Sequence, residues 1–271
     1  MDLKHKHLAV ISSGALIAIF LGLAVWYMAS HPAPVAIAPI TATTTPITEP
    51  AQTNKTIIDL HKYYEIRAKY PLQVPIKEGG TAAQQTMESF VKDQIATFKS
   101  ESNLDSLTPE DIKMQGLDQG QTYALTIAYT THTTNSTISY DYEIYANTLG
   151  AHPNTYYRTF TFDSTTGQPL QIGDLFVPGA KYLATLSTIA RAKLPAIIAD
   201  REHVSVAEVS TEMLEAGTKP EATSFQNFYL ENGNLVLVFA PYQVGPYALG
   251  TILLPIPLSS LKISLNSKYL R

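Results

Sequence analysis

Residues 225–239 read FQNFYLENGNLVLVF, and this stretch decides the fold of the C-terminal part of the chain. Two stretches rich in apolar and aromatic residues, 225–230 and 235–239, flank the dipeptide Asn232-Gly233. Asn and Gly adopt the positive φ angles of a two-residue type I′ turn, which joins antiparallel strands. The stretch therefore predicts a β-hairpin. The apolar run 251–256 predicts a last strand after it.

Four earlier stretches alternate between apolar and polar residues, which is the period of a half-buried strand. They are 56–70, 123–130, 138–146 and 155–163. Tyr and Phe dominate the apolar positions of the last three, and this favours antiparallel pairing with one solvated face.

Three helices are predicted between these strands from apolar residues at helical spacing. The first covers 81–99 with Thr81 as N-cap, the second covers 179–194 until Pro195 ends or kinks it, and the third covers 205–217 behind a capping box of Ser205 and Glu208. The predicted class is α+β, an antiparallel β-sheet with about three helices, preceded by one transmembrane helix and a Pro/Thr-rich linker.

The transmembrane prediction rests on residues 8–29, Leu8 to Ala29, which carry no charge and are long enough to cross a bilayer. Lys4 and Lys6 precede this run and no Lys or Arg follows until Lys55, so the positive-inside rule places the amino terminus in the cytoplasm. We expect a single-pass protein of the cell membrane with an extracytoplasmic C-terminal domain. A cleaved signal peptide is the competing interpretation of the same run.

The predicted organisation has five parts. They are a cytoplasmic tail at 1–7, the transmembrane helix at 8–29, a linker at 30–55, a small α+β subdomain at 56–132 and a larger α+β domain at 133–271. The linker is either an extended spacer or a disordered leader, because its prolines forbid regular helix.

Composition excludes several classes of protein. There is no cysteine, so disulfides, thiolate catalysis and zinc–cysteine sites are absent. A net charge of -4 gives no electrostatic footprint for nucleic acid. The seven histidines show no metal-ligand spacing, and we expect neither a metal nor a cofactor.

Several short motifs occur in an order that resembles a known family. They are Gly150-Ala151-His152, Asp163 followed by Gly167, Asp174-Leu175-Phe176 and the segment 241–250. Together they resemble the extracytoplasmic domain of the RsiV type, which is found in a lysozyme-sensing anti-sigma factor. The same domain is also an accessory module of PdaC-type peptidoglycan deacetylases. Residues 56–132 are similar to the small PdaC-like unit that precedes this domain in the family. The resemblance implies a binding module whose ligand is a lysozyme-like protein or peptidoglycan. We expect neither the sigma-binding nor the deacetylase part here.

The segment 241–250 contributes most of the candidate ligand-binding residues. Tyr242, Pro246 and Tyr247 make a stiff aromatic surface, and His152 is the fourth candidate. A buried corner that ties two strands together is the alternative for this segment, and a turn histidine that bonds backbone groups is the alternative for His152.

Three functions remain open after this. The leading one is non-enzymatic binding or sensing at the bacterial cell envelope. The second is an envelope hydrolase or deacetylase that uses His152 with a carboxylate. Asp141 and Glu143 share one strand face at a spacing that would suit a hydrolytic pair, and two solvent-facing carboxylates without a catalytic role are the alternative. The third is a structural accessory subunit.

Overall fold

The computed structural model describes residues 53–270, which lie in a compact unit from Ala51 to Arg271. The predicted tail and transmembrane helix, and all of the predicted linker before residue 53, fall outside the described residues. Within 53–270 no helix combines the length and the apolar character that crossing a bilayer requires.

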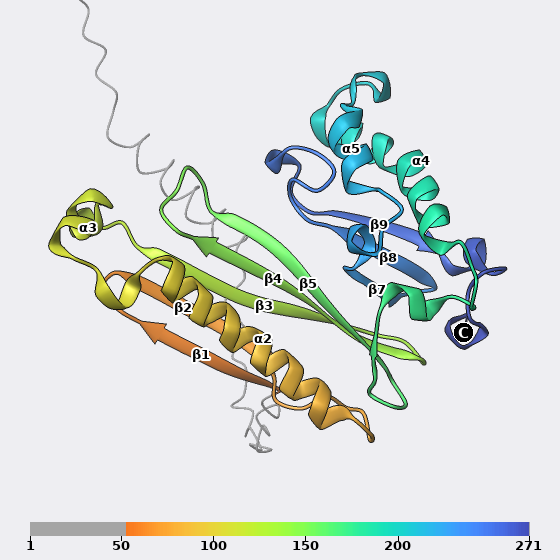
Figure 1. The fold of residues 1–271 in the computed structure, drawn as a ribbon, viewed down its shortest axis with the longest axis horizontal. Helices are drawn as coiled ribbons and strands as arrows, with labels where there is room; N and C mark the ends of the chain where they lie inside the picture. The colour runs from red at the N-terminus through yellow and green to blue at the C-terminus, as the bar shows by residue number, and fades with distance from the viewer. Residues whose placement is uncertain (1–52, 271) are drawn as a thin grey trace, which may run out of the picture. The chain divides into compact units, whose positions relative to one another are not determined.

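A mixed sheet of six strands, arranged in chain order, forms the first layer of the described residues (Figure 1). Its strands are β1 (Asn54–Leu60), β2 (Tyr64–Pro71), β3 (Tyr123–Thr133), β4 (Thr137–Asn147), β5 (Asn154–Asp163) and β6 (Pro169–Leu170). The predicted subdomain division after His132 falls within β3, one residue before its end, and β3 pairs with β4 along almost its whole length.

The prediction of a purely antiparallel sheet was wrong at one junction. All neighbouring strands of the first sheet are antiparallel except β2 and β3, which run parallel. A parallel pair needs a crossover of a dozen residues or more. Helix α2 (Gly80–Glu101), which lies between β2 and β3 in the chain, supplies that crossover and covers one face of the sheet (Figure 1).

Helix α2 buries the apolar face that the sequence predicts. Ala83, Met87, Val91 and Phe98 are buried in the same cluster as the inward residues of the sheet. Its N-cap is Gly79 rather than Thr81, with a left-handed φ of 73°. A side chain at Gly79 would place a Cβ 2.5 Å from the carbonyl oxygen of Thr166, so close approach as well as φ requires glycine there.

A second, three-stranded antiparallel sheet follows in the chain. It consists of β7 (Phe228–Glu231), β8 (Asn234–Phe239) and β9 (Ile252–Pro257). The predicted hairpin is confirmed, because Asn232 and Gly233 join β7 to β8 with φ angles of 48° and 75°. Helix α4 (Tyr182–Glu202) packs on this sheet through Leu186, Ala190, Leu194 and Ile198.

The helices differ from prediction in three respects. Helix α4 continues through Pro195 to Glu202, because the buried Leu194 and Ile198 hold both sides of the proline against the core. The predicted helix 205–217 divides into the 3-10 turn η4 (Val206–Glu208) and α5 (Thr211–Gly217), with the capping box of Ser205 confirmed. A fourth helix of the described residues, α3 (Pro109–Met114), was missed. The other 3-10 turns are η1 (Leu104–Ser106), η2 (Leu117–Gln119), η3 (Ile172–Leu175), η5 (Ala222–Phe225), η6 (Tyr247–Leu249), η7 (Leu258–Leu261) and η8 (Ser267–Tyr269).

Polar side chains join the two sheets where β5 meets β7. The Thr159 hydroxyl accepts from the Phe228 amide at 2.9 Å, and the Thr161 hydroxyl donates to the Phe228 carbonyl at 2.9 Å. The Asn227 amide group donates to the Tyr157 carbonyl at 3.0 Å and accepts from the Thr159 amide at 3.2 Å. One asparagine side chain thereby satisfies strand groups of β5 that no neighbouring strand reaches.

Two prolines reduce the number of hydrogen-bond donors at the outer edge of β9. The amide of Leu258 donates to Gly233 at 2.9 Å, so residues of even number in β9 direct their backbone groups toward β8. The backbone N–H and C=O groups of residues 253, 255 and 257 therefore point outward, away from β8. Pro255 and Pro257 have no N–H to offer at that edge.

Candidate functional site

His152 lies in the turn before β5 and bonds through both ring nitrogens. Its Nδ1 is 2.8 Å from the Pro153 carbonyl oxygen, and its Nε2 is 3.0 Å from the Tyr242 hydroxyl. A carbonyl only accepts, so Nδ1 carries the proton, and in the neutral ring Nε2 then accepts from Tyr242. The Tyr247 hydroxyl donates to the same Pro153 oxygen at 2.9 Å.

Three rings therefore form one group, called here the aromatic cluster: His152, Tyr242 and Tyr247. The rings of His152 and Tyr247 stack with centroids 4.3 Å apart and an interplanar angle of 25°. Tyr242 lies 5.4 Å from Tyr247 and 6.1 Å from His152. The structure thus brings together three of the four predicted binding residues, although His152 and Tyr242 are 90 positions apart in the chain.

The segment 241–250 combines exposed and buried residues. Tyr242 is 53% exposed and Pro246 is also exposed, whereas Tyr247 is half-buried. Val244 and Leu249 are buried in the core beneath α4. Val244 and Leu249 thus fix the segment as a corner, while the rings of Tyr242 and Pro246 are exposed to solvent, and a binding role for these two rings stays a prediction.

Backbone contacts fix the conformation of this segment. The Gln243 side chain donates to the carbonyls of Ser224 at 2.9 Å and Gly217 at 3.3 Å. Arg201 of α4 donates to the carbonyls of Leu249 and Thr251 at 2.6 and 2.7 Å. These contacts hold the base of the segment from two sides, so the segment that carries Tyr242 and Tyr247 has a fixed conformation.

Glycine at 217 is a further requirement of this packing. A Cβ on Gly217 would lie 1.9 Å from the carbonyl oxygen of Gln243. No side chain fits there unless the segment 241–250 moves, so Gly217 positions the aromatic cluster from a distance.

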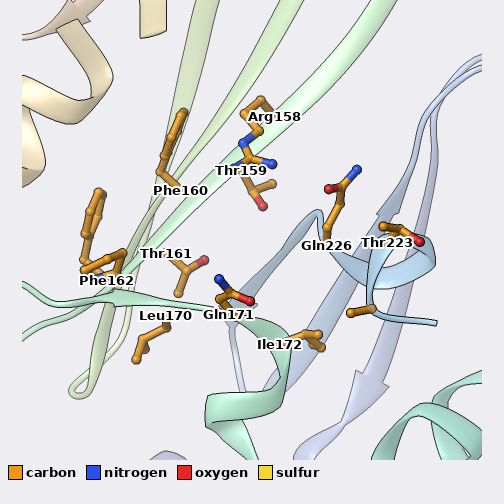
Figure 2. Close-up of a pocket in the computed structure, with 12 residues that line it drawn as sticks. Arg158, Thr159, Phe160, Thr161, Phe162, Leu170, Gln171, Ile172, Thr223 and Gln226 are labelled. Atoms are coloured by element: carbon orange, nitrogen blue, oxygen red, sulfur yellow. The ribbon is translucent and has the colours of Figure 1, made fainter. Parts of the chain in front are cut away.

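A cavity of about 280 Å³ lies along β5 (Figure 2). Arg158 of β5 is the charged residue of its lining, and Gln171 and Gln226 contribute side-chain amides from two other segments. The Arg158 guanidinium lies 5.3 Å from the centre of the Phe160 ring. Sequence reasoning missed this cavity because its walls come from three separate segments with no shared motif.

The two carboxylates on β4 have different surroundings. Burial, reinforced by the charge of Glu143, raises the pKa of Asp141 to about 7. Its Oδ1 is buried and, among the described residues, has no hydrogen-bond partner. Glu143 is exposed and accepts from the Tyr157 hydroxyl at 2.7 Å. Neither carboxylate bonds to His152, whose ring nitrogens contact Pro153 and Tyr242.

Tyr229 and His132 lie between the sheets near Asp141. Burial, followed by the charges of Asp141 and Glu231, raises the pKa of Tyr229 to about 12. The His132 ring stacks on Tyr229 at 3.6 Å, and its Nδ1 contacts Glu231 at 2.8 Å. Across residues 53–270, no three His, Cys, Asp or Glu side chains gather as a metal site would require.

Asp163 has the structural role that its turn suggests. It accepts from the amides of Thr165 at 2.9 Å and Thr166 at 3.1 Å, and it pairs with Lys268. Burial acts to raise the pKa of Asp163, but Lys268 and the two amides together hold that pKa below its ordinary value. Asp174 accepts from the Gln171 amide at 2.7 Å and closes the capping box of η3.

The fold is a two-sheet α+β domain that carries the aromatic cluster at its surface, with Tyr242 exposed. Residues 173–259 of this domain match the family model described as "Protein of unknown function (DUF3298)". This match supports the resemblance in its coarser part, a likeness to DUF3298 over residues 173–259, which include Asp174-Leu175-Phe176 and the segment 241–250. The finer resemblance, to the RsiV-type domain in particular, stays a prediction.

Two curated relatives match part of the chain. Peptidoglycan-N-acetylmuramic acid deacetylase PdaC of Bacillus subtilis is 30% identical over 51% of this chain and 28% of its own length. Esterase Rv3036c of Mycobacterium tuberculosis is 28% identical over 41% of this chain and 45% of its own length. The chain thus spans less than half the length of either relative.

A solved structure shares the fold. The crystal structure of a DUF3298-family member from Bacteroides fragilis covers 79% of this chain and 93% of its own, with a TM-score of 0.55 and 17% identity. At this identity the likeness concerns the fold alone.

Proposed function

We propose that this chain is a binding domain of the bacterial cell envelope whose ligand is peptidoglycan, and that the aromatic cluster with Pro246 forms part of the ligand surface. The observation that carries the proposal is the stacking of His152 and Tyr247 beside the exposed Tyr242 on a segment with a fixed base. Rigid aromatic side chains supply contact area at little entropic cost, and sugar rings stack on such faces. The partial match to a peptidoglycan deacetylase favours this class of ligand.

The proposal includes a place in the cell. Residues 8–29 anchor the chain in the membrane, and the described domain lies on the outer side. Amino-terminal sequencing of the native protein tests this part separately, since a mature chain that begins near Ala36 or Pro39 would reveal a cleaved signal instead.

Tyr242→Ala tests the ligand surface with little risk to the fold, because this side chain is 53% exposed. We expect at least tenfold weaker binding to peptidoglycan fragments, about 1.4 kcal/mol, with the melting temperature nearly unchanged. Tyr247→Ala should weaken binding and also lower stability, because its ring is half-buried against His152.

The matched control is Val206→Ala, which removes an exposed apolar side chain on the turn η4. Binding that stays unchanged in Tyr242→Ala, with the fold intact, removes the aromatic cluster from the ligand surface. Lysozyme is the second ligand in the same titration. Binding to lysozyme but not to peptidoglycan would replace the proposed ligand by the protein ligand that the sequence resemblance implies.

Hydrolysis is the second candidate function, and the match to an esterase favours it. The ring nitrogens of His152 contact a carbonyl and a tyrosine hydroxyl, so a His–carboxylate pair is not assembled at this site. We therefore expect no turnover of acetylated peptidoglycan or of aryl esters that is lost in His152→Ala. Such a loss would favour an envelope hydrolase over a binding domain.

A further inference from the structure

Strand β1 is the outermost strand of the six-stranded sheet within the described residues. Its pairing with β2 sets the direction of its backbone groups. The Thr53 carbonyl accepts from the Leu72 amide at 3.0 Å, and the His61 amide donates to the Tyr64 carbonyl at 2.8 Å. In β1 the backbone groups of odd-numbered residues therefore point toward β2. Asn54, Thr56, Ile58 and Leu60 therefore direct their N–H and C=O groups away from the sheet.

This edge also carries two large apolar side chains. Ile58 is 56% exposed and Leu60 is 60% exposed, and both lie on the sheet face opposite α2. A seven-residue strand with an open edge and exposed apolar residues is a template for pairing with another strand. Unlike β9, it contains no proline.

The sequence of β1 is complementary to itself. Ile57 is the middle residue of Asn54–Leu60. If two copies pair antiparallel about Ile57, every residue of the strand gains a partner, and Lys55 of each copy lies opposite Asp59 of the other. Opposite charges across a strand pair stabilise it, and like charges destabilise it. In this register the residues whose backbone groups point outward are opposite one another: Thr56 pairs with Ile58, and Asn54 pairs with Leu60. These pairs can therefore exchange backbone hydrogen bonds across the two copies.

We propose that β1 is a dimerisation edge, at which a second copy of this chain adds its own β1 antiparallel with Ile57 on the two-fold axis. The interface is isologous, since each strand presents the same residues to the other. The exposed Ile58 side chains of the two copies lie diagonally beside each other on the same face and shield one another from water. Lys99 already pairs with Asp59 at 2.5 Å, so each Asp59 then lies between two lysines.

One cysteine introduced into β1 tests the register of the two paired strands by disulfide crosslinking, because the natural chain has no cysteine. In the proposed dimer Ile57 faces its own mate in a non-hydrogen-bonded pair, where Cα atoms lie about 4.5 Å apart, and a disulfide spans about 4.4–6.8 Å. We expect full-length Ile57→Cys, purified in mild detergent, to form a disulfide-linked dimer on mild oxidation. The control is Ile58→Cys, whose mate lies about 7–8 Å away although the position is more exposed.

Charge reversal tests the same dimer without a crosslink. Lys55→Asp places two like charges opposite each other, and we expect it to weaken the dimer at least about tenfold in sedimentation experiments. The triple variant Lys55→Asp, Asp59→Lys and Lys99→Asp reverses every charge involved and should restore the dimer, since both the contact within the chain and the contact between chains are rebuilt.

Three results would overturn the proposal. One is an Ile58→Cys crosslink as efficient as that of Ile57→Cys. Another is sedimentation of the full-length chain as a monomer up to about 100 µM, the range of weak protein association. The third is a monomer whose outward β1 amides are protected from hydrogen exchange, because the edge would then be occupied by residues 1–52 of the same chain.

Discussion

Replacement of Asp141 by asparagine should stabilise the protein, and increasingly so as the pH rises. The folded structure raises the pKa of this carboxyl from 3.8 to about 7, a shift of about 3 units. At about 1.36 kcal/mol per unit, the shift corresponds to at most about 4 kcal/mol of unfolding free energy. Below pH 4 the carboxyl is protonated in both states, so its full contribution to stability is present. Between pH 4 and pH 7 the unfolded chain loses this proton first, and stability falls as the pH rises.

The side-chain amide introduced by Asp141→Asn resembles the protonated carboxyl at every pH. We therefore expect the two proteins to differ little at pH 4 and Asp141→Asn to be more stable by about 1–4 kcal/mol at pH 8, the lower part of the range reflecting partial exposure to solvent. Urea denaturation at pH 4, 6 and 8 measures the difference, with Asp105→Asn as a control for the loss of an exposed negative charge. A difference that stays constant from pH 4 to pH 8, or an Asp141→Asn protein that is less stable than the natural chain at pH 8, would refute the reasoning.

Two further predictions concern contacts that hold the layers and the aromatic cluster. Asn227→Ala should lower the unfolding free energy by about 2–4 kcal/mol, because it leaves the Tyr157 carbonyl and the Thr159 amide without partners between the sheets. Urea denaturation measures this loss of stability. A loss below about 0.5 kcal/mol would contradict the prediction. Gly217→Ala should displace the segment that carries Gln243 and alter the NMR signals of the aromatic cluster, since the added Cβ would meet the Gln243 carbonyl. Unchanged spectra would show that this contact can relax at no cost to the site.

The sequence predicts the individual helices and strands of this fold better than it predicts which of them pair or pack together. Asn232-Gly233 predicts the hairpin because turn chemistry is local, and the apolar stripe of α2 predicts both the helix and its buried face. The parallel pairing of β2 with β3 was missed because periodicity in one strand contains no information about the direction of its neighbour. Continuation of α4 through Pro195 was missed for a similar reason, since packing of Leu194 and Ile198 opposes the local cost of proline.

The candidate site shows the same limit. Tyr242, Pro246 and Tyr247 could be proposed from one short segment, because prolines, glycines and aromatic residues are concentrated there. The contact of His152 with Tyr242 could not be derived, because it joins residues 90 positions apart. The cavity beside Arg158 and the raised pKa of Asp141 also arise from tertiary packing, and alternation along β4 alone gave both carboxylates the same solvent-facing position.

The prolines of β9 limit how far association through strands can proceed. A chain with open edges on both of its sheets could recruit a new copy at each end and grow into a filament. Pro255 and Pro257 remove two of the outward N–H groups at the β9 edge of the second sheet, so that edge is a poor template for another strand. In a dimer formed through β1, one two-fold contact uses the open β1 edge of both chains, and the edge of β9 is a poor template for a third copy.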